Sequence, residues 1–281
     1  MTVAGSSPKA VLQSHGLRAK RQFGQNFLCD ARLAARISQW ATTPAEGTVV
    51  EIGAGLGALT LPLLDRAARV VAIERDRDLI AALRLELAAP IAEGRLVLVE
   101  ADAKTVDLTA LFRDTPLPRV VAGNLPYQIT GPLLEKTAAS RPLIQRAVLM
   151  VQLEVADRIV AEPGSASYGA LSVFIQAQYE ARRALVVRRG AFYPQPKVDS
   201  AVVLLDPLSP PIAEETTTFR TVVKAAFGQR RKKLRNAWRG LMSGSLADLA
   251  AAAERAGVDL DARGESLTVE QFARMATEVQ A

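Results

Sequence analysis

The sequence predicts an α/β protein in which a doubly wound, mostly parallel sheet with an antiparallel edge pair precedes a small all-helical C-terminal domain. Three observations lead to this fold class. Short apolar runs alternate with helical patterns up to about residue 151, two β-rich runs follow, and a Pro-rich stretch then precedes a purely helical tail. Alternation of this kind is typical of strands joined by crossover helices.

Five short apolar runs are expected to be strands buried on both faces of a parallel sheet, because such strands have continuous apolar sequences. They are residues 48–52, 69–73, 96–99, 119–122 and 147–151. Around and between them, apolar residues recur at helical spacing, as at Leu79, Ile80, Leu83 and Leu87. The expected helices are 30–41, with Asp30 as N-cap, then 58–65, 77–87, 108–112 and 132–139.

The pattern changes after residue 179. Two β-rich runs, 184–188 and 201–205, predict an antiparallel pair at the sheet edge, and residues 206–211 (Asp-Pro-Leu-Ser-Pro-Pro) indicate a linker. Beyond it, an apolar stripe begins at Phe219 and indicates packed helices. Gly257 is placed to end a helix over 246–256, and Thr268 with Gln271 forms a capping-box start for the last helix.

These boundaries predict four parts of the chain. Residues 1–20 form a mobile basic leader, and residues 21–206 form the sheet domain with its cofactor site. Residues 207–213 form the linker, and residues 214–281 form a helical domain that binds a polyanion.

Composition excludes several classes of protein. Of 281 residues, 49% are hydrophobic and 23% are charged, which is typical of a globular chain with a sizeable core. One cysteine, Cys29, excludes an internal disulfide framework and favours a reducing compartment, so the cytoplasm is the expected location. One histidine, His15, excludes a Ser-His-Asp triad and a multi-histidine metal site, so we expect no metal. No apolar run is long enough to cross a bilayer.

The positive charge is concentrated in two stretches without acids. The formal net charge is +6, yet residues 216–247 alone carry eight basic side chains and no Asp or Glu. Residues 1–29 are also free of acids. Patches of one sign indicate a polyanionic partner such as nucleic acid, whereas a solvated basic face would normally mix both signs.

A glycine-rich turn follows the first expected strand and opens a helix. Glu51-Ile-Gly53-Ala-Gly55-Leu-Gly57 has G-x-G-x-G spacing with an acid two residues ahead of it, and Ala58 stands where a dinucleotide fingerprint requires glycine. This Rossmann-like arrangement favours S-adenosylmethionine over NAD. Glu74 ends the second strand, where a carboxylate can accept hydrogen bonds from ribose hydroxyls. Asp102 ends the third strand, where a carboxylate can accept a hydrogen bond from an adenine amino group. Either acid alone would also suit a helix N-cap.

Asn124-Leu125-Pro126-Tyr127 follows the fourth expected strand. An amide, a rigid proline and an aromatic ring at the carboxyl end of a strand are suited to holding a flat, amino-bearing ring at the mouth of such a sheet. A Pro-containing turn is the simpler interpretation of the same residues.

The sequence resembles the small-subunit rRNA adenine N6,N6-dimethyltransferases, which use S-adenosylmethionine, from about Lys20 to the C-terminus. The matching segments are Gln25–Leu28, Glu51–Thr60, Glu74, Asp102, Asn124–Tyr127, Gln152 with Glu154–Ala156 and Arg158, Tyr168–Gly169 with Leu171–Val173, Phe192, Pro194, Pro196–Ser200 and Gln229–Lys232. The departures are few: Leu153 replaces a frequent lysine, and Cys29 follows the Gln-Asn-Phe-Leu run.

The resemblance implies a site for S-adenosylmethionine and an RNA surface. Its cofactor residues are Asn26, the backbone of Leu28, Gly53, Gly55, Glu74, Asp102 and Asn124. The family methylates two adjacent adenines, twice each, in a hairpin near the 3′ end of small-subunit rRNA. Its expected partner is therefore this RNA or the assembling small subunit, and we expect a monomer. The expected RNA contacts are Lys20, Arg21, Lys197, Arg230, Arg231, Lys232, Lys233 and Arg235.

The mechanism that we expect uses Asn124, Leu125, Pro126, Tyr127 and Phe192. The Asn124 side-chain oxygen and the Leu125 carbonyl accept the two amino hydrogens of adenine, and Tyr127 with Phe192 sandwiches the base, although both rings would also suit a core. Three alternatives remain: a large-subunit rRNA adenine methyltransferase of the antibiotic-resistance type, a non-catalytic rRNA-binding assembly factor, and an NAD-linked oxidoreductase. Glycine spacing argues against the last, and the intact Asn124–Tyr127 element argues against the second.

Overall fold

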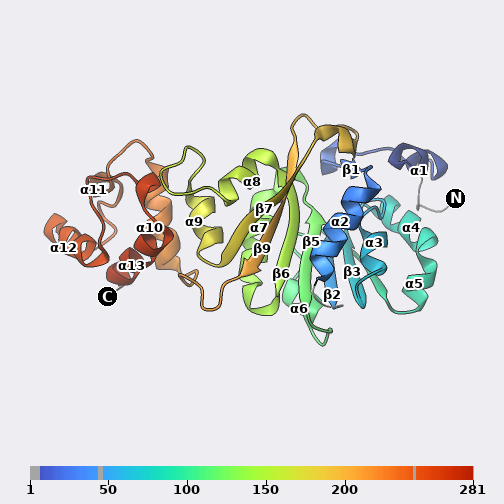
Figure 1. Ribbon diagram of the computed structural model, residues 1–281, viewed down its shortest axis with the longest axis horizontal. Helices are drawn as coiled ribbons and strands as arrows, with labels where there is room; N and C mark the ends of the chain where they lie inside the picture. Colours follow the sequence, from blue (N-terminus) through green and yellow to red (C-terminus); the bar gives the residue numbers. More distant parts are fainter. Residues whose placement is uncertain (1–6, 44–46, 243–244, 281) are drawn as a thin grey trace. The chain divides into compact units, whose positions relative to one another are not determined.

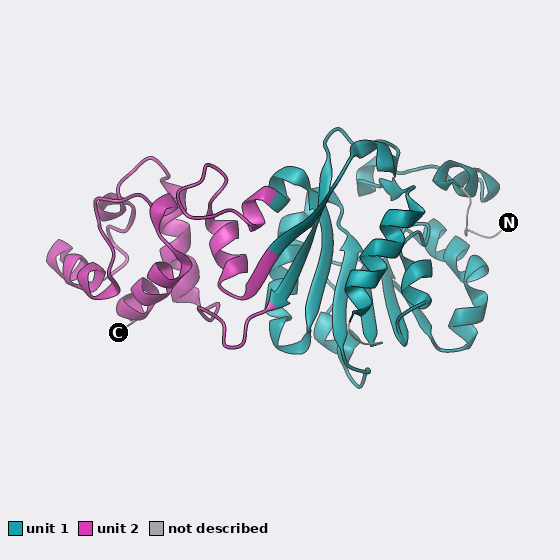
Figure 2. Cartoon of the chain, viewed as in Figure 1, with its two compact units in different colours: residues 1–156, 182–206 teal, residues 157–181, 207–281 magenta. Residues whose placement is uncertain are grey.

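The computed structural model describes residues 7–43, 47–242 and 245–280 (Figure 1). The chain divides into two compact units, residues 1–156 with 182–206 and residues 157–181 with 207–281 (Figure 2). The sequence analysis assigned residues 157–181 to the sheet domain. They group with the second unit instead, because helix α9 (Ala170–Gln176) packs against α10 (Thr217–Gly228).

The first unit is built on a seven-stranded sheet of order β4-β3-β2-β5-β6-β9-β7. Its strands are β2 (Thr48–Ile52), β3 (Arg69–Glu74), β4 (Leu96–Glu100), β5 (Arg119–Asn124), β6 (Arg146–Gln152), β7 (Tyr179–Val187) and β9 (Ser200–Pro207). The first five are parallel and β9 is antiparallel to β6, which confirms the predicted fold class. Strand order reverses between β2 and β5, and doubly wound folds bind ligands at such a switch point.

Helices cover the sheet because its strands are apolar on both faces. Val49, Val70, Val120 and Val148 pack with residues of α2 and α3, while the alternate residues of these strands point to the opposite face and are equally buried. The helices of this unit are α2 (Ala31–Thr42), α3 (Thr60–Leu64), α4 (Arg77–Glu86), α5 (Ala88–Ala92), α6 (Leu108–Phe112), α7 (Thr130–Ala139) and the start of α8 (Leu153–Ile159). Asp30 caps α2 as expected, its carboxylate accepting from the backbone of Arg32 and Leu33.

Part of the leader, which the sequence predicts to be mobile, forms a helix. Residues 1–6 lie outside the described residues, but α1 (Pro8–Ser14) is a helix whose Val11 and Leu12 are buried with Phe27, Leu56 and Leu79. Helix α1 was not predicted, because its seven residues are too few to show a helical repeat. A further pair of short strands, β1 (Phe27–Leu28) and β8 (Phe192–Tyr193), joins the N-terminal segment to the connection between β7 and β9.

The second unit is helical around one apolar core. Its further helices are α11 (Leu234–Ala237), α12 (Leu246–Ala256) and α13 (Val269–Gln280). Trp238 is fully buried there, and its indole N–H donates to the Val222 carbonyl over 3.0 Å. Two predicted helix ends are confirmed: Gly257 ends α12 in the left-handed conformation, and Thr268 and Gln271 form reciprocal capping bonds ahead of α13. No helix in the described parts of the chain is long and apolar enough to cross a membrane.

Gly123 of β5 pairs with Ile52 of β2, immediately before Asn124. A Cβ atom there would come 2.4 Å from the Ile52 carbonyl oxygen, which belongs to the sheet and cannot move aside cheaply. We therefore expect Gly123→Ala to destabilise the fold by about 1–3 kcal/mol, the usual penalty of overpacking. Thermal or urea unfolding measures this loss.

Gly131→Ala, near the start of α7, is the matched control, because nothing lies within 4 Å of the added carbon. It should leave stability unchanged or slightly raised, since alanine is the better helix former. Equal stability of the two variants would contradict the assigned packing of β5 on β2.

Candidate active site

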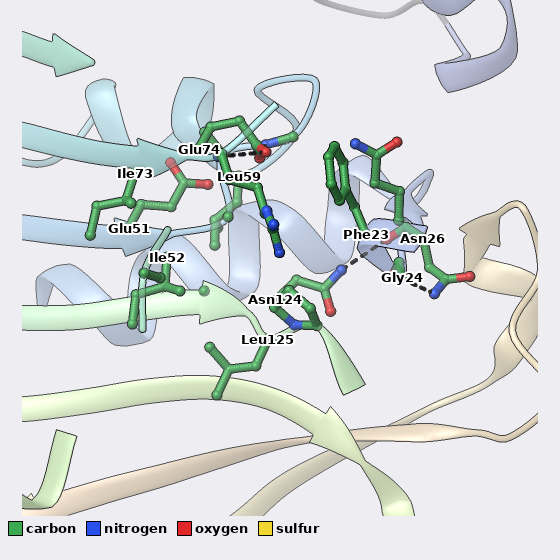
Figure 3. Close-up of a pocket in the computed structure, with 18 of the residues that line it drawn as sticks. Phe23, Gly24, Asn26, Glu51, Ile52, Leu59, Ile73, Glu74, Asn124 and Leu125 are labelled. Carbon is green, nitrogen blue, oxygen red and sulfur yellow. Dashed lines mark hydrogen bonds between the residues drawn. The ribbon is translucent and has the colours of Figure 1, made fainter. Parts of the chain in front are cut away.

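A pocket opens at the carboxyl ends of the parallel strands (Figure 3). It is lined by the turn after β2, the ends of β3 and β5, residues 101–103 after β4, and residues 23–28 of the N-terminal segment. All of these belong to the first unit. The pocket therefore lies at the switch point that the strand order defines.

The turn after β2 needs its glycines. Gly53, Gly55 and Gly57 have φ values of 81°, 58° and 81°, in the left-handed region that other residues rarely adopt. A Cβ on Gly55 would also lie 3.2 Å from the Phe27 ring. This turn leaves open backbone beside the pocket, where a ligand can approach closely.

Glu74 is a fixed acceptor at the tip of β3. One carboxylate oxygen accepts from the Gly55 N–H over 3.0 Å, and the other accepts from the N–H groups of Arg75 and Asp76 over 2.9 Å each (Figure 3). Burial raises the pKa of Glu74, and these three bonds partly offset the effect. Because a carboxylate offers about four acceptor positions, Glu74 keeps capacity for a ligand hydroxyl.

Asp102 lies in the pocket wall after β4. Its carboxylate accepts from the Lys104 N–H over 3.0 Å and lies 3.6 Å from Arg75 Nη1. The loop that carries it is held by Lys136 of α7, whose ammonium donates to the carbonyls of Ala103, Lys104 and Val106. The role of Lys136 could not be predicted, because the sequence does not show which carbonyls a lysine on a helix will reach in the fold.

Asn124 ends β5 with its amide held in one orientation. Its side-chain Nδ2 donates to the Asn26 carbonyl over 3.0 Å, and the Asn26 side chain in turn donates to the Gly24 carbonyl over 3.0 Å (Figure 3). The nitrogen of the Asn124 amide is therefore occupied on the N-terminal side. Its oxygen remains available to a donor in the pocket.

Leu125, Pro126 and Tyr127 continue from Asn124 along the pocket wall. The Leu125 N–H donates to the Met150 carbonyl over 3.0 Å, which fixes the backbone. Within the described residues nothing donates to the Leu125 carbonyl oxygen. The Tyr127 hydroxyl shares a 2.6 Å hydrogen bond with the Ser200 hydroxyl, and burial raises the pKa of the phenol.

Phe192 is placed differently from expectation. Its side chain is 4% exposed and belongs to the core cluster that contains Leu28, Leu33 and Val187, and it does not line the pocket. The cause is the β1–β8 pairing, which sets Phe192 opposite Leu28. Leu28 itself does line the pocket, as expected. Of the two rings expected to sandwich the base, Tyr127 lines the pocket and Phe192 does not.

Lys20, an expected RNA contact, forms ion pairs within the first unit. Its ammonium binds Asp76 over 2.5 Å and Asp78 over 2.7 Å, and Gln25 donates to Asp76 over 2.7 Å. Burial raises the pKa of Asp76, but the bonds from Lys20 and Gln25 hold it below its usual value. These contacts fasten residues 20–26 beside the pocket. The sequence analysis assigned no role to Asp76.

The five expected RNA contacts of the second unit fall into two groups. Arg230 donates to the carbonyls of Ala166 and Tyr168, and both Lys233 and Arg235 bind Asp261. By contrast, Arg231 and Lys232 are exposed, and no ion pair in the described part of the chain engages them. In the first unit, Arg21 and Lys197 are likewise exposed.

The family described as ribosomal RNA adenine dimethylase matches residues 16–281. The chain belongs to the ribosomal RNA adenine dimethylase family. This confirms the resemblance that the motifs indicated.

Curated relatives of the chain include two proteins named ribosomal RNA small subunit methyltransferase A. That of Anaeromyxobacter sp. (strain K) is 44% identical over 288 residues, covering 98% of each chain. That of Streptomyces avermitilis is 45% identical over 267 residues, covering 93% of this chain and 88% of the relative.

Two solved structures resemble the chain over most of its length. A dimethyladenosine transferase from Plasmodium falciparum has a TM-score of 0.76 at 25% identity, covering 89% of this chain and 95% of the other. The 23S rRNA methyltransferase ErmE has a TM-score of 0.69 at 28% identity, covering 91% and 100%.

Glu51 makes the stability of the folded chain depend on pH. It is 1% exposed, and burial raises its pKa from 4.5 to about 8, although a hydrogen bond from Thr60 opposes the shift. Between these two pH values the folded chain keeps a proton that the unfolded chain has lost, so stability falls by roughly 1 kcal/mol per pH unit. Above the folded pKa this loss ends.

We therefore expect Glu51→Gln to be less sensitive to pH than the parent between pH 5 and 8, as measured by urea unfolding. Exposed Glu93→Gln is the control and should follow the parent profile. If Glu51→Gln kept the parent slope, the carboxyl would not be protonated in the folded state.

Proposed function

We propose that this chain transfers methyl groups from S-adenosylmethionine to the N6 amines of two adjacent adenines in the 3′-terminal hairpin of small-subunit rRNA, twice at each base. Membership of the dimethylase family supports the reaction class. The observation that carries the proposal to particular residues is the hydrogen bond from the Asn124 amide to the Asn26 carbonyl, since it presents the Asn124 oxygen as an acceptor.

The pocket residues fit S-adenosylmethionine. Glu74 retains acceptor capacity for a ribose hydroxyl, Asp102 in the pocket wall can accept from an adenine amino group, and the positive-φ turn at Gly53 and Gly55 leaves backbone open to the ligand. Asn26 and the backbone of Leu28 complete the site from the N-terminal side. When bound, the cofactor supplies an electrophilic methyl group on a cationic sulfur.

The contribution of the chain is orientation and electrostatics. The Asn124 Oδ1 and the Leu125 carbonyl accept the two N6 hydrogens of the adenine, which directs the nitrogen lone pair toward the methyl donor. Pro126 stiffens the turn, and the Tyr127 ring stacks on the extruded base, an interaction worth about 1–3 kcal/mol. No imidazole takes part, because His15 binds Glu86 away from the pocket.

The RNA partner is inferred from the free charges. Arg231 and Lys232 in the second unit, with Arg21 and Lys197 in the first, are exposed cations suited to phosphate contacts. We propose that small-subunit rRNA, naked or partly assembled, is bound by a monomer without a metal ion. The single cysteine, Cys29, agrees with a cytoplasmic location.

Large-subunit rRNA is the alternative substrate, which the likeness to ErmE supports. Mass mapping of methylated adenines in rRNA from cells with and without this protein separates the two. Loss of dimethyladenine from the small-subunit 3′ hairpin supports the proposal. Loss from large-subunit rRNA, or no loss at all, would refute it.

For the acceptor role, we expect Asn124→Ala to keep the dissociation constant of S-adenosylmethionine within about tenfold while lowering kcat by about 10²-fold or more. Calorimetry and labelled methyl transfer to the RNA hairpin measure the two quantities. The control is Asn236→Ala, an exposed asparagine of the second unit that should match the parent. Parental turnover in Asn124→Ala would remove the acceptor role.

For the RNA surface, we expect the change of Arg231 and Lys232 to Gln to weaken the salt dependence of RNA binding. The slope of log K against log salt is negative, and it should become shallower by about 1.8, since each phosphate contact on a duplex contributes about 0.9. The charge-matched control changes Lys233 and Arg235, which are already paired with Asp261, and should alter the slope less. Filter binding across a salt series gives both slopes. Equal slopes in the two variants would argue against the distinction between free and paired cations.

A further inference from the structure

Tyr127 carries the proposed stacking ring, and the far end of that ring is anchored. Its hydroxyl and the Ser200 hydroxyl lie 2.6 Å apart. The ring is attached to the backbone at Cβ, so a bond at the opposite end restrains both side-chain torsions. Without it, the half-buried ring would be free to swing within the pocket mouth.

Ser200 is itself held in place by burial and by the hydrogen bonds of its neighbours. It is fully buried and is the first residue of β9, where it pairs with Gln152 at the end of β6. Next to it, the Asp199 carbonyl accepts from the Leu153 N–H over 3.0 Å. The Asp199 carboxylate accepts from the Arg189 N–H over 2.9 Å and from the Arg188 guanidinium over 2.8 Å. The hydroxyl that holds Tyr127 is thus fixed by the sheet on one side and by the β7–β8 connection on the other.

Stacking depends on the plane of the ring. An aromatic side chain gains its full interaction with a base only when the two planes are held parallel at contact distance, and ordering a loose ring on binding has an entropic cost. A preorganised ring removes that cost. A serine that sets the plane of Tyr127 therefore acts on base engagement without touching the base.

We propose that Ser200 is a positioning residue for the methylation reaction, holding the Tyr127 ring in the plane against which the target adenine stacks. The inference rests on the proposed function, because it gives the ring an adenine to stack on. It assigns Ser200 a role that the sequence alone did not show.

The test compares Ser200→Ala, Tyr127→Phe and the double variant in methyl transfer to the RNA hairpin. Each single change removes the same hydrogen bond, and Tyr127→Phe keeps the ring. We expect each to raise KM for the hairpin or lower kcat so that kcat/KM falls about tenfold, as for loss of one positioning bond. The double variant should fall no further, since residues that act through one bond are not additive. The dissociation constant of S-adenosylmethionine should be unchanged.

A second readout follows the base directly. A hairpin with 2-aminopurine in place of the target adenine should lose part of its stacking-dependent fluorescence quenching in Ser200→Ala and in Tyr127→Phe. The matched control is Ser38→Ala, another fully buried serine of the first unit, which bonds the Pro62 carbonyl and does not line the pocket. It should keep the parental kcat/KM and quenching even where its thermal stability falls.

The proposal fails if Ser200→Ala and Tyr127→Phe keep the parental kcat/KM and quenching, or if their effects add in the double variant. It also fails if Ser38→Ala shows the same loss, which would make the effect one of general stability. These outcomes differ from failure of the proposed function, in which the parent protein itself would not methylate the hairpin.

Discussion

The site depends on one constraint, the hydrogen bond that the Asn124 amide donates to the Asn26 carbonyl. An amide can present either its nitrogen or its oxygen to a ligand, and only the oxygen can accept the hydrogens of an adenine amine. The carbonyl that decides this lies in residues 20–26, which Lys20 and Gln25 tie to Asp76. The Asp76 N–H in turn donates to Glu74, so the proposed acceptor and the proposed cofactor acid share one framework.

The electrostatics of the pocket favour a cationic ligand. Glu51 and Glu74 both lie in its wall, and burial raises the pKa of each, because two carboxylates in a poorly solvated site are costly to ionise. Each acid would ionise more readily beside a cation, such as a sulfonium or an ammonium group, than beside an anion. The spacing of the glycine turn, with Ala58 where a dinucleotide fingerprint requires glycine, also argues against a dinucleotide.

The strands and their tips could be predicted from the sequence because they depend on local patterns. Apolar runs such as 48–52 and 119–122 specify buried strands. Glu74 and Asn124 are the last residues of β3 and β5, and Asp102 lies two residues beyond β4. The partners of charged and aromatic side chains could not be predicted, since the fold sets them. Lys20 meets an acid 56 residues away, Lys233 meets one 28 residues away, and Phe192 is drawn into the core by pairing with β1. No local pattern distinguishes such residues from Arg231 or Tyr127.

The most direct test of the account is a crystal structure of the protein with the RNA hairpin and a non-reactive analogue of the methyl donor. The account predicts the target N6 within about 3 Å of both Asn124 Oδ1 and the Leu125 carbonyl oxygen, with the amide nitrogen still on Asn26. An Asn124 amide turned so that its nitrogen faces the base, or a base bound away from the tip of β5, would contradict it.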